Sequence, residues 1–110
     1  MAEKIIYVNS TKEFDDLLEK EKFVLVDFWA TWCTPCRMIA PVIEKLSDQY
    51  SEKITVAKVD VDQNQELSIR YGIQSIPTVI LFKDGKIAAK EIGVKPLNSF
   101  THMLDSHIAS

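Results

Sequence analysis

The sequence lacks an excess of basic residues. Its 110 residues include 13 Lys or Arg and 16 Asp or Glu, which gives a formal net charge of −3 at pH 7. Proteins that hold a phosphate backbone normally carry a basic surplus, so we expect that nucleic acid is not the main partner. The chain also lacks any apolar run of the roughly 18 residues that a membrane-spanning helix needs, so we expect no association with a membrane.

The first residues lack the apolar core and the small-residue cleavage site of a secretion signal. Disorder is also disfavoured, because 46% of the residues are hydrophobic and 26% are charged, as in ordinary globular domains. We therefore expect a cytoplasmic protein in which residues 1–110 form a single domain, and at this size a monomer.

Cysteine is scarce, with only Cys33 and Cys36 present. A secreted mini-protein uses several cysteines to join distant segments, whereas a bridge between these two would close almost no loop and add little stability. A chain that places both of its cysteines in one C-x-x-C motif is therefore expected to use them for chemistry.

A zinc site is the alternative for this cysteine pair, with His102 and His107 as the remaining ligands. Two features argue against it. Cys36 and His102 are separated by 65 residues, and a five-residue spacing on a helix turns the two imidazoles about 140° apart. We expect no metal, and we interpret the histidines as solvated groups on the last helix.

Apolar periodicity and turn signals predict a β-α-β-α-β-α-β-β-α order. Strands are expected at Ile5–Val8, Phe23–Ala30, Ile54–Asp60, Thr78–Lys83 and Lys86–Gly93. A first helix is expected after the capping-box spacing of Ser10 and Glu13, and a second over Pro35–Tyr50. A third is expected over Gln63–Tyr71, with Gly72 as its cap. The last begins at Pro96, and its inner face carries Leu97, Phe100, Leu104 and Ile108.

Two of these signals define the sheet. The run Phe23–Ala30 is almost continuously apolar, as in strands that are covered on both faces. Asp84-Gly85 is typical of a two-residue type I′ turn, which joins antiparallel strands. With right-handed crossovers between the earlier strands, the prediction is an α/β protein with one mixed central sheet and helices on both faces.

The two cysteines lie where the chain leaves a buried strand and enters a helix. Cys33 is thus expected at a helix N-terminus, where free amide hydrogens and the positive end of the dipole favour a thiolate. Thiols in such places have pKa values of roughly 3.5–7.5 instead of about 8.5. We expect Cys36 to lie one turn further in, more buried, and able to attack a mixed disulfide formed at Cys33.

The segment Trp32–Cys36, following Val26–Ala30, resembles the thioredoxin family, and the resemblance covers nearly the whole chain. Matching segments are Ala40-Pro41, Val56–Asp60, Tyr71–Ile73, Ile76–Thr78, Asp84-Gly85 and Gly93. The resemblance implies a thioredoxin fold and thiol–disulfide oxidoreductase activity.

The resemblance also implies catalytic roles. Cys33 matches the attacking thiol of the family and Cys36 the resolving thiol. Asp27 matches a buried carboxylate that takes a proton from the resolving cysteine, and Lys58, one strand over, matches its lysine partner. Independently, an acid in an apolar strand should have a raised pKa because burial disfavours its charge. The alternatives are that Asp27 is a structural acid and that Lys58 is an ordinary paired or solvated lysine.

A contact surface for clients is implied as well. Pro77 matches a cis-proline that faces the dithiol, and the backbone of the neighbouring Ile76 could pair with an extended client segment. With Trp32, Gly93 and Val94, these residues would surround Cys33 as a flat apolar surface.

The chain departs from the common family pattern at three positions. Thr34 stands where Gly is most frequent, Arg37 where Lys is frequent, and Ser75 where many members have Gly. Thr34 and Pro35 lie between the cysteines, the segment through which the family tunes its redox couple. The pair contains no histidine, unlike the oxidants and isomerases of the family, which favours a reductant.

The sequence thus predicts a general protein-disulfide reductase. By resemblance, it has no bound cofactor and is recharged with NADPH electrons by thioredoxin reductase. An oxidase or isomerase on the same fold remains an alternative, as does an adaptor without catalysis that binds partners through Trp32, Ile76 and Val94.

Overall fold

A computed structural model describes residues 4–109, which form one five-stranded sheet with four helices. The strands are β1 (Ile6–Tyr7), β2 (Phe23–Trp29), β3 (Thr55–Asp60), β4 (Thr78–Lys83) and β5 (Lys86–Ile92). The helices are α1 (Thr11–Lys20), α2 (Thr34–Gln49), α3 (Gln65–Arg70) and α4 (Leu97–Ile108). The predicted element order is confirmed.

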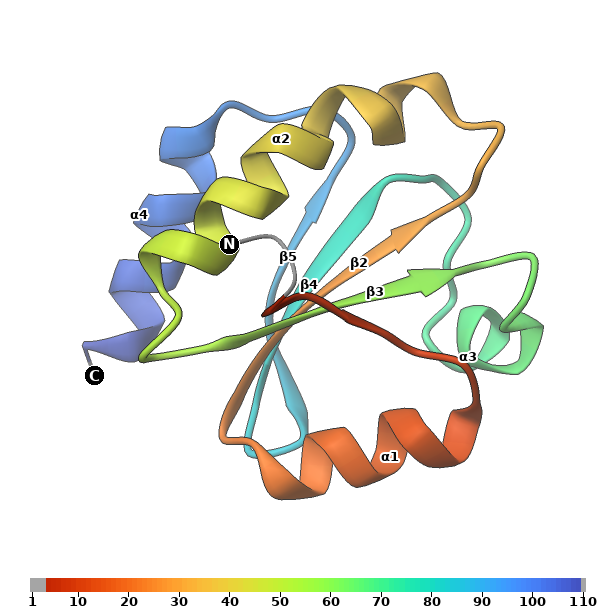
Figure 1. Ribbon diagram of the computed structural model, residues 1–110, viewed down its shortest axis with the longest axis horizontal. Coiled ribbons are helices and arrows are strands. Elements are labelled where there is room, and N and C mark those ends of the chain that lie inside the picture. The colour runs from red at the N-terminus through yellow and green to blue at the C-terminus, as the bar shows by residue number, and fades with distance from the viewer. Residues whose placement is uncertain (1–3, 110) are drawn as a thin grey trace.

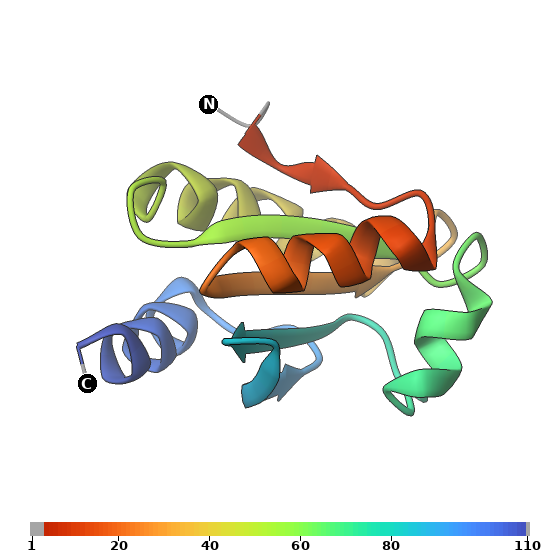
Figure 2. The same ribbon diagram turned by 90° about the horizontal axis from the view of Figure 1, so that it is seen from below.

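The sheet is mixed, as expected, with the strand order β1-β3-β2-β4-β5. The strands β1 and β2 both run parallel to β3, while β4 is antiparallel to both β2 and β5. Figures 1 and 2 show α2 and α4 on one face of the sheet and α1 on the other. The helix α3 belongs to the α1 side, because Leu67 packs in the same core as Phe14.

The central position of β2 in the sheet explains its apolar run. Its first six residues are buried, and their side chains alternate between the two faces. Leu25 packs in the core beneath α2 and α4, whereas Val24 and Val26 pack in the core beneath α1 and α3. A strand covered on both faces needs apolar residues at successive positions, and the only charged residue within β2 is Asp27.

The turn and the first N-cap are confirmed, but the capping box and several element ends differ from the prediction. The helix expected over Gln63–Tyr71 spans Gln65–Arg70, and the helix expected over Pro35–Tyr50 spans Thr34–Gln49. Asp84 and Gly85 have φ angles of 52° and 81°, the positive pair that a type I′ turn requires. Ser10 accepts a hydrogen bond from the Glu13 backbone N–H, but the Glu13 carboxylate accepts from Asn9 rather than from Ser10. The first strand is shorter than predicted: among the described residues Ile6 and Tyr7 stand in register with β3, and beyond them the Val8 N–H still donates to the Lys58 carbonyl.

The last helix begins after Pro96, which is its N-cap. Phe100 and Leu104 are fully buried as expected, and Leu97 and Ile108 pack against the same core. Met103 is also buried, which the predicted inner face omitted.

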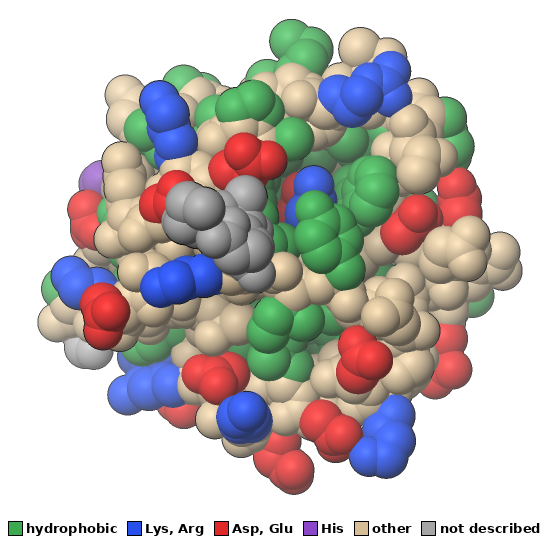
Figure 3. All heavy atoms as spheres, viewed as in Figure 1, with side chains coloured by type: hydrophobic (Ala, Val, Ile, Leu, Met, Phe, Trp, Pro, Cys, Tyr) green, Lys and Arg blue, Asp and Glu red, His purple; other side chains and the backbone are tan. Residues whose placement is uncertain are grey.

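The exposed face in Figure 3 shows hydrophobic side chains interspersed with charged side chains of both signs. None of the helices within residues 4–109 is both long enough and apolar enough to cross a membrane.

Candidate functional site

The two cysteines form a disulfide at the start of α2, with their Cα atoms 5.3 Å apart. Cys33 is the N-cap of the helix, and its Sγ accepts a hydrogen bond from the Cys36 backbone N–H over 3.1 Å. Pro35 lies in the first turn, where its fixed φ suits a helix and its missing N–H is not needed. A thiolate at Cys33 would therefore meet a backbone donor and the positive end of the helix dipole.

The expected difference in burial between the cysteines is wrong, because Cys33 and Cys36 are each only 3% exposed. Both pack with Ala30, and the partly buried Trp29 and Ile76 lie against them. The bridge joins the two sulfurs within one apolar cluster, so in the disulfide form Cys33 is covered as fully as Cys36.

The loop before β4, the strand that lies on the other side of β2 from β3, approaches the disulfide. The Ile76–Pro77 peptide bond is cis, as the resemblance implied, and the Ile76 carbonyl oxygen lies 3.8 Å from Cys33 Sγ. The Pro77 carbonyl accepts a hydrogen bond from the Gly93 N–H over 2.9 Å. Gly93 has a φ of +89°, which side-chain-bearing residues rarely adopt, and exposed Val94 follows it. The structure thus brings these four residues together beside Cys33.

Trp32 is exposed, at 65%. Its indole N–H donates to Asp62 over 2.8 Å, so the ring is held toward the chain segment after β3. Sequence reasoning did not single out Asp62. The one signal for it was its position just beyond the carboxyl end of β3, the strand that lies parallel to β2.

Arg37 contacts the cysteine segment from the first turn of α2. Its Nη1–H donates to the Thr31 carbonyl over 2.7 Å, and its Nη2–H donates to the Thr34 hydroxyl over 3.1 Å. Arg37 appeared in the sequence only as a departure from the family pattern, and these two acceptors could not be read from it.

Asp27 lies beneath the site and is 1% exposed. It pairs in register with Lys58, and Lys58 Nζ lies 3.8 Å from Asp27 Oδ2. Within the described part of the chain, neither carboxylate oxygen has a hydrogen-bond partner. Burial raises the pKa of Asp27 to about 6, against the opposing effect of the Lys58 charge. The carboxyl group can therefore exchange a proton near neutral pH.

The Lys58 ammonium lies between aromatic rings, 4.8 Å from the centre of Trp29 and 5.9 Å from that of Tyr7. Tyr7, Lys58 and Asp27 are register neighbours on three adjacent strands, so they share one face of the sheet. Trp29 follows Asp27 by two residues in β2 and lies on that face too. Trp29 also packs against the cysteine cluster.

Between residues 4 and 109, no cluster of three or more His, Cys, Asp or Glu side chains could hold a metal ion. His107 Nδ1 lies 2.8 Å from the Met103 carbonyl oxygen, within its own helix.

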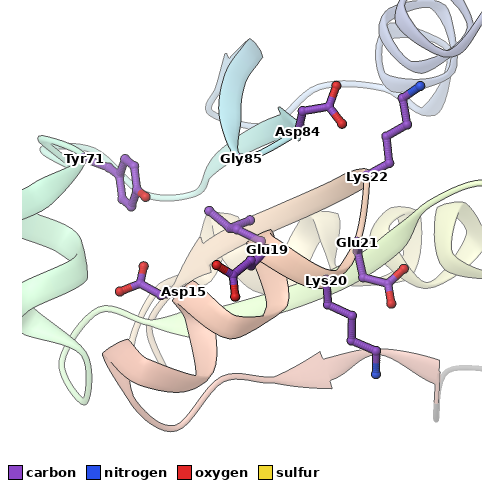
Figure 4. A pocket seen from close by; sticks show the side chains of 9 residues that line it. Asp15, Glu19, Lys20, Glu21, Lys22, Tyr71, Asp84 and Gly85 are labelled. Carbon is purple, nitrogen blue, oxygen red and sulfur yellow. The ribbon is translucent and has the colours of Figure 1, made fainter.

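A separate cavity of about 580 Å³ lies near the C-terminal end of α1 (Figure 4). Charged groups of both signs, including Asp15, Glu19 and Lys20, line it together with Tyr71 and the hairpin residue Asp84. None of its lining residues belongs to the site around the cysteines.

Comparison with known proteins gives one consistent result. The family model described as Thioredoxin matches residues 5–106. The chain is 43% identical over 108 residues to a thioredoxin of Acidithiobacillus ferridurans, covering 98% of this chain and 100% of that protein. It is 41% identical over 101 residues to a thioredoxin of Bacillus subtilis, covering 92% and 97% of the two chains.

Solved structures agree with the sequence comparison. A point mutant of a thioredoxin from Halobacterium salinarum superimposes with a TM-score of 0.89 at 36% identity, covering 97% of this chain and 93% of the other. A Plasmodium falciparum thioredoxin gives a TM-score of 0.86 at 32% identity, covering 93% and 98%.

Proposed function

Since this chain belongs to the thioredoxin family and is therefore a thiol–disulfide oxidoreductase, we propose that it acts as a general reductant of protein disulfides. The family, the fold and the class of enzyme expected from the cysteine motif are confirmed. The observation that carries the proposal is the Cys33–Cys36 disulfide at the N-terminus of α2, facing the loop of Ile76 and Pro77.

The reaction proceeds by two thiolate attacks. The Cys33 thiolate attacks one sulfur of a client disulfide, forming a mixed disulfide and releasing one client thiolate. The Cys36 thiolate then attacks Cys33 Sγ, which closes the Cys33–Cys36 bridge and releases the second client thiolate. The client gains two electrons from the dithiol, and each released thiolate takes up a proton.

Asp27 is proposed as the acceptor of the Cys36 proton. With a pKa of about 6, its carboxyl is mostly ionised at neutral pH and can take a proton from a nearby thiol, directly or through water. The Lys58 charge, 3.8 Å away, moderates that basicity and keeps the pKa of Asp27 from rising further.

We propose that clients bind over Trp32, Ile76, Pro77, Gly93 and Val94. An extended client segment would pair with the Ile76 backbone as an added strand, while the exposed side chains of Trp32 and Val94 contact its side chains. The Gly93 N–H already donates to Pro77, so it holds the surface together rather than binding the client.

Thr34 and Pro35 are proposed to tune the couple, because both lie between the cysteines and are exposed in the first turn of α2. A change of 30 mV corresponds to about 1.4 kcal/mol, which one hydroxyl or one steric contact can supply.

The cycle closes when thioredoxin reductase returns NADPH electrons to the Cys33–Cys36 bridge, with no cofactor bound to this chain. We propose a cytoplasmic monomer with residues 1–110 in one domain. The sparse cysteine usage supports the compartment, and a family model spanning residues 5–106 supports the single domain.

The first test is the reduction potential of the Cys33–Cys36 couple, equilibrated against a defined thiol buffer. A value below about −230 mV supports a reductase, whereas a value above about −200 mV contradicts it and indicates an oxidase or isomerase. Absence of any two-electron couple would leave the adaptor as the better interpretation.

A trapping experiment tests the division of roles between the cysteines. The Cys36→Ser variant should accumulate a mixed disulfide with a client such as insulin, because nothing resolves it. The Cys33→Ser variant should form none, and wild type should reduce insulin catalytically with NADPH and thioredoxin reductase. Equal trapping by both variants would contradict the assignment, and biological activity of Cys33→Ser would support the adaptor.

A further inference from the structure

Arg37 connects two points of the chain on either side of the attacking cysteine. Its guanidinium donates to the Thr31 carbonyl, before Trp32 and Cys33, and to the Thr34 hydroxyl, directly after them. The donors of a guanidinium are fixed in one plane, so a single side chain can hold two acceptors at a set separation, which a lysine ammonium does less well.

The position of Arg37 is not explained by helix stability. A cation in the first turn of a helix opposes the positive end of the dipole, where an acidic residue is favourable. The first turn of α2 contains no acidic residue, and Arg37 is the only Lys or Arg between Lys22 and Lys45. The two hydrogen bonds are thus the evident gain from a cation at this place.

The same loop is held from the other side through Trp32. Its indole N–H donates to Asp62, so the segment between Thr31 and Thr34 has side-chain bonds both toward β3 and toward α2. Between these bonds lies Cys33, whose Sγ accepts the Cys36 N–H.

We propose that Arg37 and Thr34 form a clamp that positions Cys33 against the amide donors of α2 and so sets the fraction of Cys33 present as thiolate. The two departures from the common family pattern, Thr34 and Arg37, then act together, because the Thr34 hydroxyl accepts a hydrogen bond from the Arg37 guanidinium. Arg37 is a positioning residue in this scheme, and the inference rests on the proposed attack by Cys33.

Other charged groups of the site are held constant in the test. Asp27 and Lys58 lie on the sheet below, and Lys58 reaches the cysteine cluster through Trp29. Asp62 lies on the far side of Trp32. Within residues 4–109, none of these three side chains forms a hydrogen bond or an ion pair with Arg37 or Thr34. Substitutions within the clamp therefore leave these groups in place.

The test measures alkylation of Cys33 by iodoacetamide in the reduced full chain as a function of pH, with mass spectrometry to identify the modified cysteine. Thr34→Val should lower the rate below the titration midpoint about threefold, because the guanidinium loses one of its two acceptors in the cysteine segment, and should leave the rate at saturating pH unchanged. Thr34→Ser keeps the hydroxyl and should match wild type.

The coupling of the two residues is the decisive measurement. Arg37→Lys keeps the charge but loses the planar set of donors that holds two acceptors at once. It should lower the alkylation rate at least as much as Thr34→Val. In an Arg37→Lys background, Thr34→Val should have no further effect. An equal effect of Thr34→Val in both backgrounds, or no effect in either, would overturn the clamp, as would a loss of stability without a shift of the midpoint.

This experiment is independent of the proposed function. Alkylation requires only a Cys33 thiolate, so the clamp can fail while the potential and the insulin assay still identify a reductase. Conversely, a potential above about −200 mV would reject the reductase and leave the thiolate measurement valid.

Discussion

Asp27 lies at a position where an apolar residue would favour stability. Its neighbours in β2, Val26 and Phe28, are fully buried, and its own carboxylate has no hydrogen-bond partner among the described residues. A buried carboxylate that lacks hydrogen bonds is costly when ionised, and the ion pair with Lys58 is too long, at 3.8 Å, to supply a good hydrogen bond. The proposed proton transfer therefore accounts for Asp27 better than folding does.

We expect Asp27→Asn to stabilise the oxidised protein at neutral pH. The pKa of Asp27 is about 6 in the folded state against 3.8 ordinarily, so the unfolded chain loses the proton first as pH rises. Stability therefore falls between about pH 4 and pH 6 and stays lower above that range. A pKa difference of about two corresponds to about 3 kcal/mol, which is the upper limit of the gain at pH 8.

Urea unfolding at several pH values checks this expectation. The gain from Asp27→Asn should disappear below about pH 4, where both states hold the proton. Glu52→Gln, at an exposed carboxylate outside the site, is the control and should show no such pH-dependent gain. A variant less stable than wild type at pH 8 would contradict the assigned burial cost.

Lys58→Met should raise the pKa of Asp27 further above 6. The Lys58 charge lowers that pKa in the folded protein, so its removal leaves burial unopposed. An opposite charge at this distance is worth about one pKa unit or more. The carboxyl chemical shift of Asp27 during an NMR titration measures the change directly. Lys12→Met, in an exposed pair with Asp16, is the control, and an unchanged titration of Asp27 in Lys58→Met would refute the argument.

At the scale of elements, the sequence predicted the order and type of the helices, strands and turns well, and their first and last residues less well. The type I′ turn, the N-cap at Ser10 and the cap at Gly72, whose φ is +60°, depend on neighbouring residues only, and all three are borne out. The ends of β1 depend on its register with β3, in which Ile6 and Tyr7 are the described partners. A partner strand some fifty residues away cannot be read from local periodicity.

The hairpin between β4 and β5 gives a prediction at this scale. Gly85→Ala should lower the free energy of unfolding by about 1 kcal/mol, because a Cβ is disfavoured at a φ of +81°. No heavy atom lies within 4 Å of the added Cβ, so the effect is one of backbone conformation rather than collision. Asp84→Asn tolerates positive φ and should be close to neutral in the same urea titration. Equal losses in the two variants would argue against this explanation.

At the scale of the whole molecule, the site is assembled from distant segments. Cys33 and Trp32 were visible in the sequence because they are contiguous, and the resemblance supplied Asp27 and Lys58. The contacts Trp32–Asp62 and Lys58–Tyr7 were not foreseen, since each depends on which strands are adjacent and in what register. Burial of Cys33 was also missed, because it results from the packing of Ile76 and Trp29 against the bridge.

The two cores should unfold together. Both pack on the same central strand, Leu25 on one face and Val26 on the other, so neither can be exposed without disrupting β2. Far-UV circular dichroism and the fluorescence of Trp29 and Trp32 should therefore give one coincident urea transition in the oxidised protein. A fluorescence change that clearly precedes the loss of secondary structure would show that the site opens independently.

The bridge between Cys33 and Cys36 spans a single helical turn, which has a consequence for how oxidation state is read by other molecules. Opening so short a loop releases very little chain, so the sheet and helices gain almost no freedom when the sulfurs separate. The oxidised and reduced forms then present nearly the same outline to the solvent. A partner that must distinguish the reduced dithiol from the disulfide therefore has to do so within a few ångströms of the two sulfur atoms. It recognises the chemical state of the sulfurs rather than a change in conformation.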